Sequence, residues 1–188
     1  MKTMVKKLIF IVVLTYPIFG YGQNDSLRYI FEKILNQYRV ENSLNKIKID
    51  VTYRERAESH LNYMVNQKAI SHSDMYKNIK NCVGENVAYT PTFSKEDMKY
   101  IVTFLDMDSI ITKLIKDANI SVQKNNPNFV LAVNLFKQWK DSPDHNKTLL
   151  NKNSETYYLT YKTTTIDRVI NGRLFPSYFL FSEYVTFD

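Results

Sequence analysis

The end of the chain restricts the possible folds more than any other segment. Residues 156–166 and 174–187 both alternate in side-chain character, as half-buried strands do, and the second stretch is rich in aromatics. Asn171-Gly172 lies between them and is typical of a two-residue hairpin turn. The sequence therefore predicts a closing antiparallel hairpin. Its first strand is expected to place Tyr157, Leu159 and Tyr161 on one face, and its second strand Tyr178, Leu180, Ser182 and Tyr184.

Helical periodicity dominates the chain before this hairpin. Apolar residues recur every three or four positions in residues 27–39, 53–70, 94–105, 111–118 and 127–139. Asp25 or Ser26 is expected to cap the first helix, and Asp50 or Thr52 the second. Trp139, the single tryptophan, is expected to anchor the core. Helices followed by an antiparallel hairpin predict an α+β fold.

The first 22 residues are expected to be a secretory signal peptide. Lysines precede an apolar run at residues 8–19, and Gly20-Tyr21-Gly22 offers small residues where a signal peptidase cuts. The run is shorter than the roughly 20 residues that cross a bilayer, so no membrane span is expected after cleavage. Residues 23–188 should then form one domain, secreted to the periplasm or the cell exterior, and the style of the signal suits a bacterial source.

Charge and cysteine content exclude two classes of protein. The formal net charge of +6 includes three lysines of the predicted signal, so the exported chain is near +3. This excess is spread along the sequence without a basic block, so no nucleic-acid partner is expected. Cys82 is the single cysteine, which leaves no internal disulfide. We expect it to act as a small buried hydrophobic residue, with a reactive thiol or a metal ligand near the cleft as the alternative.

Two polar segments carry the candidate chemistry. The first holds His72 and then Gly84-Glu85-Asn86, where Gly84 is expected to form a tight turn that aims Glu85. In the second, Ser142-Pro143 should start a helix whose first turn contains His145. The positive end of a helix disfavours imidazolium, so His145 should be neutral. We expect His72, Glu85 and His145 to meet in one cleft.

The third histidine, His60, lies in the predicted second helix without a reactive neighbour in sequence. It is therefore expected to be structural or exposed.

These segments resemble, in order, the motifs of the CAP superfamily, the SCP-like family of cysteine-rich secretory proteins, antigen 5 and pathogenesis-related proteins. The matching segments are Leu35-Asn36 with Arg39, Ala57 to Met64 with His72-Ser73, Gly84-Glu85-Asn86-Val87, and Trp139 with Ser142 to His145. The resemblance covers residues 28–187. It implies a three-layer α-β-α sandwich with a small antiparallel sheet, and a cleft formed by His72, Glu85 and His145.

The sequence departs from the family pattern at four places. Ser142 stands where eukaryotic members often have a second glutamate, and Asp144 replaces the usual glycine before the second histidine. Residues 94–126 are longer than the usual connection, which predicts a helical insert at 95–125. Tyr157-Tyr158 replaces an expected glycine-rich strand.

The cleft is expected to bind a ligand. Two imidazoles and a carboxylate, from His72, His145 and Glu85, suit a divalent metal such as zinc, with Asn86 and Ser142 beside them. Family members are reported to bind lipids or sterols, metals or cell-surface partners, so a small apolar molecule is also an expected ligand.

Two other functions stay open. In the first, the cleft residues are purely structural and hydrogen-bond to one another without a ligand. In the second, Glu85 acts as the base of a metal-dependent hydrolase, or Ser142 as a nucleophile with His145 as its base. Ser142 is better explained as a helix cap, and the sequence has no nucleophile-elbow or short metalloprotease motif to support catalysis.

Overall fold

The computed structural model describes residues 27–73, 79–92, 109–120, 126–170 and 173–188. The predicted signal peptide, the caps at Asp25 and Ser26, the helical segment 94–105 and the turn Asn171-Gly172 lie outside these residues, so they stay predictions. Of the helices that are described, none is long and apolar enough to cross a membrane.

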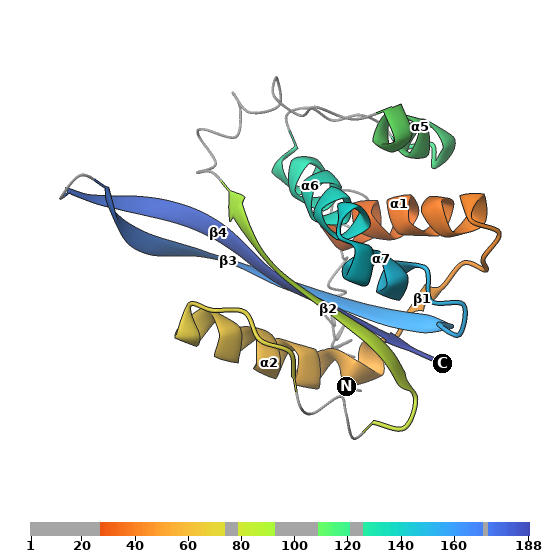
Figure 1. Ribbon diagram of the computed structural model, residues 1–188, viewed down its shortest axis with the longest axis horizontal. Coiled ribbons are helices and arrows are strands. Elements are labelled where there is room, and N and C mark those ends of the chain that lie inside the picture. The colour runs from red at the N-terminus through yellow and green to blue at the C-terminus, as the bar shows by residue number, and fades with distance from the viewer. Residues whose placement is uncertain (1–26, 74–78, 93–108, 121–125, 171–172) are drawn as a thin grey trace, which may run out of the picture.

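A four-stranded sheet with the order β1-β3-β4-β2 forms the middle layer (Figure 1). The long strands β3 (Thr156–Ile170) and β4 (Arg173–Phe187) pair antiparallel along their whole length, up to the residues that flank the predicted turn. Strand β2 (Cys82–Thr92) pairs antiparallel with β4, and the short β1 (Lys48–Ile49) pairs parallel with β3. The α+β class and the closing hairpin are confirmed. The parallel pair makes the sheet mixed rather than purely antiparallel.

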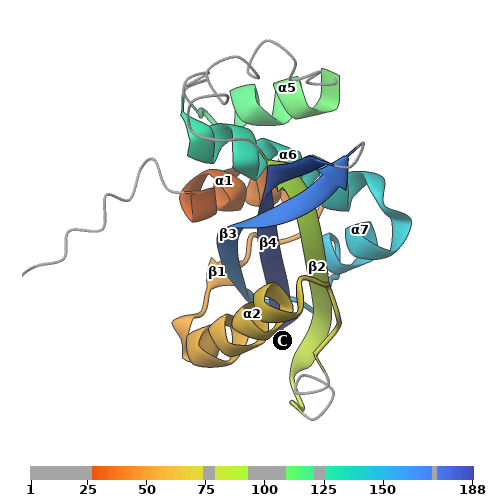
Figure 2. The ribbon, with the colours of Figure 1, turned by 90° about the vertical axis from the view of Figure 1, so that its left-hand side faces the viewer.

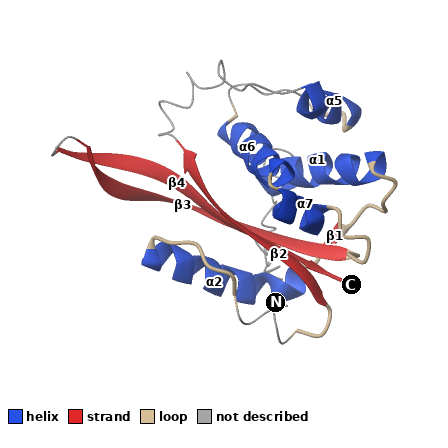
Figure 3. Ribbon diagram, viewed as in Figure 1, coloured by secondary structure: helices blue, strands red, loops and turns tan. Residues whose placement is uncertain are grey.

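Helices cover both faces of this sheet. Figures 2 and 3 show α1 (Leu27–Glu41), α6 (Pro127–Asp141) and α7 (Pro143–Leu149) on one side, and α2 (Arg54–Gln67) on the other. Helix α5 (Ser109–Asp117) packs on α1, and a short 3-10 turn, η2 (Val51–Tyr53), leads into α2. The expected three-layer sandwich is confirmed.

Strand alternation divides the core into two parts. On the side of α1 and α6, Tyr157, Leu159, Leu180 and Tyr184 belong to one core cluster with Trp139, whose buried ring contacts that of Tyr184. On the side of α2, Val87 and Phe181 pack against Leu61 and Met64. The faces expected for β3 and β4 are confirmed among the described side chains, and so is the core position of Trp139.

Arg39 does not end the first helix, because α1 continues to Glu41. Its guanidinium is buried and donates hydrogen bonds to backbone carbonyls of the connections that follow α1 and α7, those of Asn45, Leu149, Asn151 and Ser154. A planar group with five N–H donors can satisfy several carbonyls at once. Arg39 therefore ties α1 to the end of α7.

Asp50 acts as a cap, although not of α2 directly. Its carboxylate accepts a hydrogen bond from the amide of Thr52 and so begins η2, which runs into α2 without a break.

A candidate metal centre around Glu85

Glu85 lies within strand β2 and not on a turn, which corrects the sequence prediction. Gly84 is also part of this strand, beside a register shift that follows Cys82. A Cβ atom at Gly84 would lie 2.6 Å from the methyl group of Thr148 on α7. Glycine is required here because helix α7 approaches the strand closely, and alternation along the strand directs Glu85 to the face that α2 covers.

The carboxylate of Glu85 binds two groups of the segment that follows α2. Its Oε2 lies 2.7 Å from Nδ1 of His72, and the amide of Ser73 donates to both of its oxygens, at 3.1 and 3.2 Å. The side chain of Glu85 is 10% exposed, whereas that of His72 is 61% exposed. The predicted meeting of His72 and Glu85 is therefore present, with the imidazole on the solvent side.

A second histidine and a second glutamate lie on the inner side of Glu85. Nδ1 of His60 is 3.6 Å from Oε1 of Glu85 and 3.2 Å from Oε1 of Glu183. Both residues are buried, with 6% of the His60 side chain and none of the Glu183 side chain exposed. One ligand atom from each of the three residues lies within 4.8 Å of the others, so the group is able to hold a metal ion.

The two neighbouring carboxylates change the protonation of His60. Burial alone would lower its pKa, but Glu183, by a hydrogen bond and by its charge, and then Glu85 outweigh burial, so the pKa of His60 is raised. His60 is thus a buried member of the polar cluster. Of the two positions expected for it, structural or exposed, the exposed one is wrong.

His60 and Glu183 are not among the site residues expected from sequence, although each has a sequence feature that indicates a buried polar position. His60 lies three residues after Ala57 and four before Met64, on the buried stripe of α2. Glu183 is the only acidic residue in the aromatic run of β4, flanked on its own face by Phe181 and Val185. A charged residue in the centre of an apolar strand is rarely buried without a partner. The identity of that partner depends on strand register, which the sequence did not supply.

His145 lies in α7 as predicted, on the other side of β2. The side-chain amide of Asn86 donates to the backbone carbonyl of His145, at 2.9 Å, and so holds the helix against the strand. Ser142 stands at the N-cap position of α7, although its side chain makes no capping hydrogen bond. Pro143 therefore defines the start of this helix, and the expected capping role of Ser142 is absent.

The electrostatics of His145 agree with the expected neutral imidazole. Its pKa is lowered first by burial and next by the charge of His72, while Asp144 opposes the shift. Nδ1 of His145 is buried and makes no hydrogen bond to the described residues. An imidazole nitrogen of this kind is available to a metal ion.

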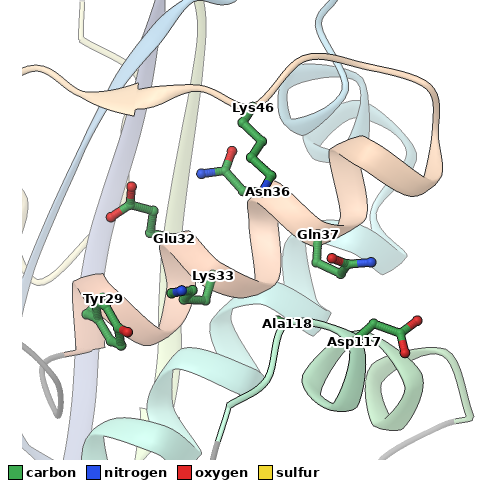
Figure 4. Close-up of a pocket in the computed structure, with 8 residues that line it drawn as sticks. All are labelled: Tyr29, Glu32, Lys33, Asn36, Gln37, Lys46, Asp117 and Ala118. Atoms are coloured by element: carbon green, nitrogen blue, oxygen red, sulfur yellow. The ribbon is translucent and has the colours of Figure 1, made fainter.

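A separate pocket lies between α1 and α5, away from this cluster (Figure 4). It has a volume of about 290 Å³, and its lining is mostly polar: Tyr29, Glu32, Lys33, Asn36, Gln37, Lys46, Asp117 and Ala118. Burial raises the pKa of Glu32, and Lys33 partly offsets that effect. This lining does not favour an apolar ligand.

Sequence comparison assigns the family. The model of the cysteine-rich secretory protein family, CAP, matches residues 33–157, which include His60, His72, Glu85 and His145. The chain belongs to the CAP family. The fold of this CAP domain is similar to that of an outer surface protein from Borrelia burgdorferi, with 12% identity and a TM-score of 0.43 over 85% of this chain and 91% of that chain. No curated protein sequence matches the CAP domain significantly.

Proposed function

We propose that this CAP domain binds a divalent cation at an outer site formed by His72, Glu85 and His145. The contact of 2.7 Å between Nδ1 of His72 and Oε2 of Glu85 is the observation that carries this proposal. It pairs an exposed imidazole with a nearly buried carboxylate, and the lowered pKa of His145 supplies a second neutral imidazole nearby.

The donor set fits a metal of the zinc class. Two imidazoles and one carboxylate are the ligands of several zinc sites that keep a fourth position open. The buried Nδ1 of His145 lacks a hydrogen-bond partner among the described residues, as expected for a nitrogen that binds a cation. Asn86 supports the site because it fixes the backbone of His145, and Ser142 lies at the start of the same helix. A bound cation would act as a Lewis acid for a ligand at the open position.

A purely structural role for Glu85 is the second candidate function, and one observation favours it. The amide of Ser73 donates to the carboxylate of Glu85, which therefore tethers residues 71–73 to strand β2 whether or not a cation binds. Substitution of His72 and His145 separates the two functions. It would remove the proposed cation site but leave the hydrogen bonds between Ser73 and Glu85, to which neither histidine contributes.

Zinc titration by calorimetry tests the proposal. The purified chain in metal-free buffer is compared with a His72→Ala, His145→Ala double variant, and the melting temperature of both is recorded without metal. We expect micromolar binding in the parent chain and at least a tenfold loss at the outer site in the double variant, with little change in melting temperature. Binding that is identical in the two proteins would show that His72 and His145 hold no cation and would overturn the outer site.

The cation site is proposed to work outside the cytoplasm. This follows from the signal-like residues 1–22, and membership of a family named for secretory proteins supports it. The occupant of the open position is proposed to be a small molecule, a lipid or a group on a cell surface. N-terminal sequencing of protein recovered from the medium or the periplasm of a bacterial host tests export, and an intact Met1 would contradict it.

A further inference from the structure

His60 and Glu183 are not used by the outer site, yet they lie directly behind it. Glu183 belongs to β4, the strand that pairs with both β2 and β3, where it stands opposite Val87 of β2. Glu85 pairs with Val185, so the two glutamates are diagonal neighbours on one face of the sheet. His60 reaches this face from α2 and contacts both carboxylates.

The charges in this cluster do not balance. With His60 neutral, Glu85 and Glu183 bring two negative charges into a buried region, and with His60 protonated one negative charge remains. Two like charges held close together in a buried region repel each other, and a nearby positive charge relieves that repulsion. A divalent cation bound by neutral His60 and both carboxylates would bring the net charge of the cluster to zero, which a proton on His60 does not.

The distances match those of metal ligands. Ligand atoms on a tetrahedral zinc ion are about 3.4 Å apart, because each lies about 2.1 Å from the metal. The two distances from Nδ1 of His60, 3.2 Å to Glu183 and 3.6 Å to Glu85, lie on either side of this value. All three ligand atoms of the group are within 4.8 Å of one another.

The buried nitrogen of His60 gives independent support. Nδ1 is buried and faces a carboxylate oxygen of Glu183 and one of Glu85, so anionic oxygen atoms surround it as they would a cation. The other ring nitrogen, Nε2, approaches the hydroxyl of Ser71 at 3.5 Å. A histidine that binds a metal through one nitrogen commonly has a polar partner at the other.

We propose that His60, Glu85 and Glu183 form an inner cation site, for which zinc is the divalent ion that fits best. The carboxylate of Glu85 is shared, since Oε1 faces His60 and Oε2 faces His72. The inner and outer sites would therefore hold two cations bridged by one carboxylate. The inner site needs neither His72 nor His145, so it goes beyond the proposed outer site and does not depend on it.

Imidazole ¹⁵N NMR of the full chain tests the inner site without altering it. The sequence has three histidines, so signals of His72 and His145 are assigned by substituting each with alanine, and the remaining signals belong to His60. Spectra recorded without metal at one fixed pH give the reference positions of the two nitrogen signals of His60. Zinc should move the Nδ1 signal of His60, in the parent chain and equally in the His72→Ala, His145→Ala double variant.

Calorimetry with a Glu183→Gln variant provides the second readout. We expect two zinc ions per chain in the parent protein, one in Glu183→Gln and one in the His72→Ala, His145→Ala variant, with the inner affinity at least about tenfold weaker after loss of Glu183. Glu55→Gln, an exposed carboxylate of α2, is the matched control and should keep both ions.

The outcomes separate the two sites. Zinc that leaves the signals of His60 unchanged and binds Glu183→Gln like the parent chain overturns the inner site, and the outer site stands. Zinc that moves the signals of His60, with the same number of zinc ions bound per chain in the parent protein and in the His72→Ala, His145→Ala variant, overturns the outer site and supports the inner one. If Glu183→Gln does not fold, the NMR result alone decides, because it uses no substitution in the inner site.

Discussion

The carboxylates of Glu85 and Glu183 lie on neighbouring strands and face the same imidazole, that of His60. Their oxygens and the ring nitrogen lie within 4.8 Å of one another in a region where Glu183 is fully buried. Such a group needs a positive charge at its centre, whether a proton or a metal ion. The contact of both carboxylates with His60 therefore makes the stability of the metal-free protein depend on the protonation of His60.

We predict that the metal-free protein loses stability as the pH rises above the ordinary histidine value. The pKa of His60 is raised from 6.5 in the folded chain, because Glu183 and Glu85 outweigh the effect of burial. A group with a raised folded pKa contributes stability that is complete below its unfolded pKa and is lost as the pH rises through the folded pKa. Urea denaturation with a chelator, from pH 5 upward, measures this.

His60→Gln is the control for this effect. The difference in unfolding free energy between the parent chain and the variant should be largest near the acid end of the series and should shrink as the pH rises. A difference that is constant with pH would show that His60 is not protonated in the folded protein.

His145 is predicted to act in the opposite direction. Its pKa is lowered from 6.5 by burial and by His72, so the unfolded chain binds a proton there more readily than the folded one. The stability that His145 contributes is complete above about pH 6.5 and declines as the pH falls toward its folded pKa. His145→Gln should therefore gain relative to the parent chain on acidification, as judged from the same urea series. A relative loss on acidification would contradict the neutral state of His145.

The close approach of α7 to β2 predicts a strong effect at Gly84. Gly84→Ala places a methyl group 2.6 Å from Cγ2 of Thr148, so the helix that carries His145 must shift. We expect a loss of about 1–3 kcal/mol in unfolding free energy, typical of overpacking in a rigid environment. Chemical denaturation measures the loss, and zinc affinity at the outer site should fall with it.

Thr148→Ser offers a matched test because it removes the methyl group and keeps the hydroxyl. The combined Gly84→Ala, Thr148→Ser variant should recover much of the loss, so the two substitutions should be coupled in a double-mutant cycle. Additive effects would mean that the cost of alanine at position 84 arises elsewhere.

Arg39 is predicted to be a major contributor to stability. Arg39→Met should cost about 3 kcal/mol or more, since each buried carbonyl left without a donor costs about 1–3 kcal/mol. Two of the four hydrogen bonds that Arg39 donates are buried and the other two are partly buried. Arg39→Lys should lose nearly as much, because an ammonium group lacks the planar fork that reaches these carbonyls. Thermal unfolding measures both variants. Full stability in the lysine variant would show that charge alone is sufficient.

The features of the fold that the sequence predicts correctly are those that depend on interactions between residues close in sequence. Helix stripes and strand alternation are short-range, so the α+β layers, the hairpin and the faces of Tyr157 and Tyr184 were predicted correctly. The pairing of His72 with Glu85 followed from family resemblance. His60 was judged by its neighbours in sequence instead of its place on the buried stripe of α2. Its contact with Glu183 depends on how α2 packs on the sheet. The position of Glu85 beside Glu183 depends on the pairing of β2 with β4, which periodicity does not specify.

The turn that the sequence predicts at Gly84 is wrong for a similar reason. Glycine has two uses, conformational freedom and close packing, and the sequence does not distinguish them. The requirement at Gly84 comes from Thr148, which lies far along the chain and in another layer of the fold.

Residues 95–125 are predicted to be an insert that the CAP domain can lose and still fold. Within it, α5 packs three buried side chains against the core, those of Ile111, Leu114 and Ile115, and Lys113 of α5 pairs with Glu41 at the end of α1. Replacing 95–125 with a short linker should therefore leave a cooperative but less stable domain, because α1 would lose this cover. Far-ultraviolet circular dichroism and thermal unfolding measure the outcome.

Leu114→Ala in the intact chain calibrates the contribution of α5. It should cost about 2–4 kcal/mol, as for other buried leucines, because its side chain is fully buried. If the chain that lacks residues 95–125 shows no cooperative thermal unfolding, α5 belongs to the folding unit and is not an insert. A deleted chain that folds and still gives a zinc-dependent shift of His60 would show that the sandwich alone builds the inner site.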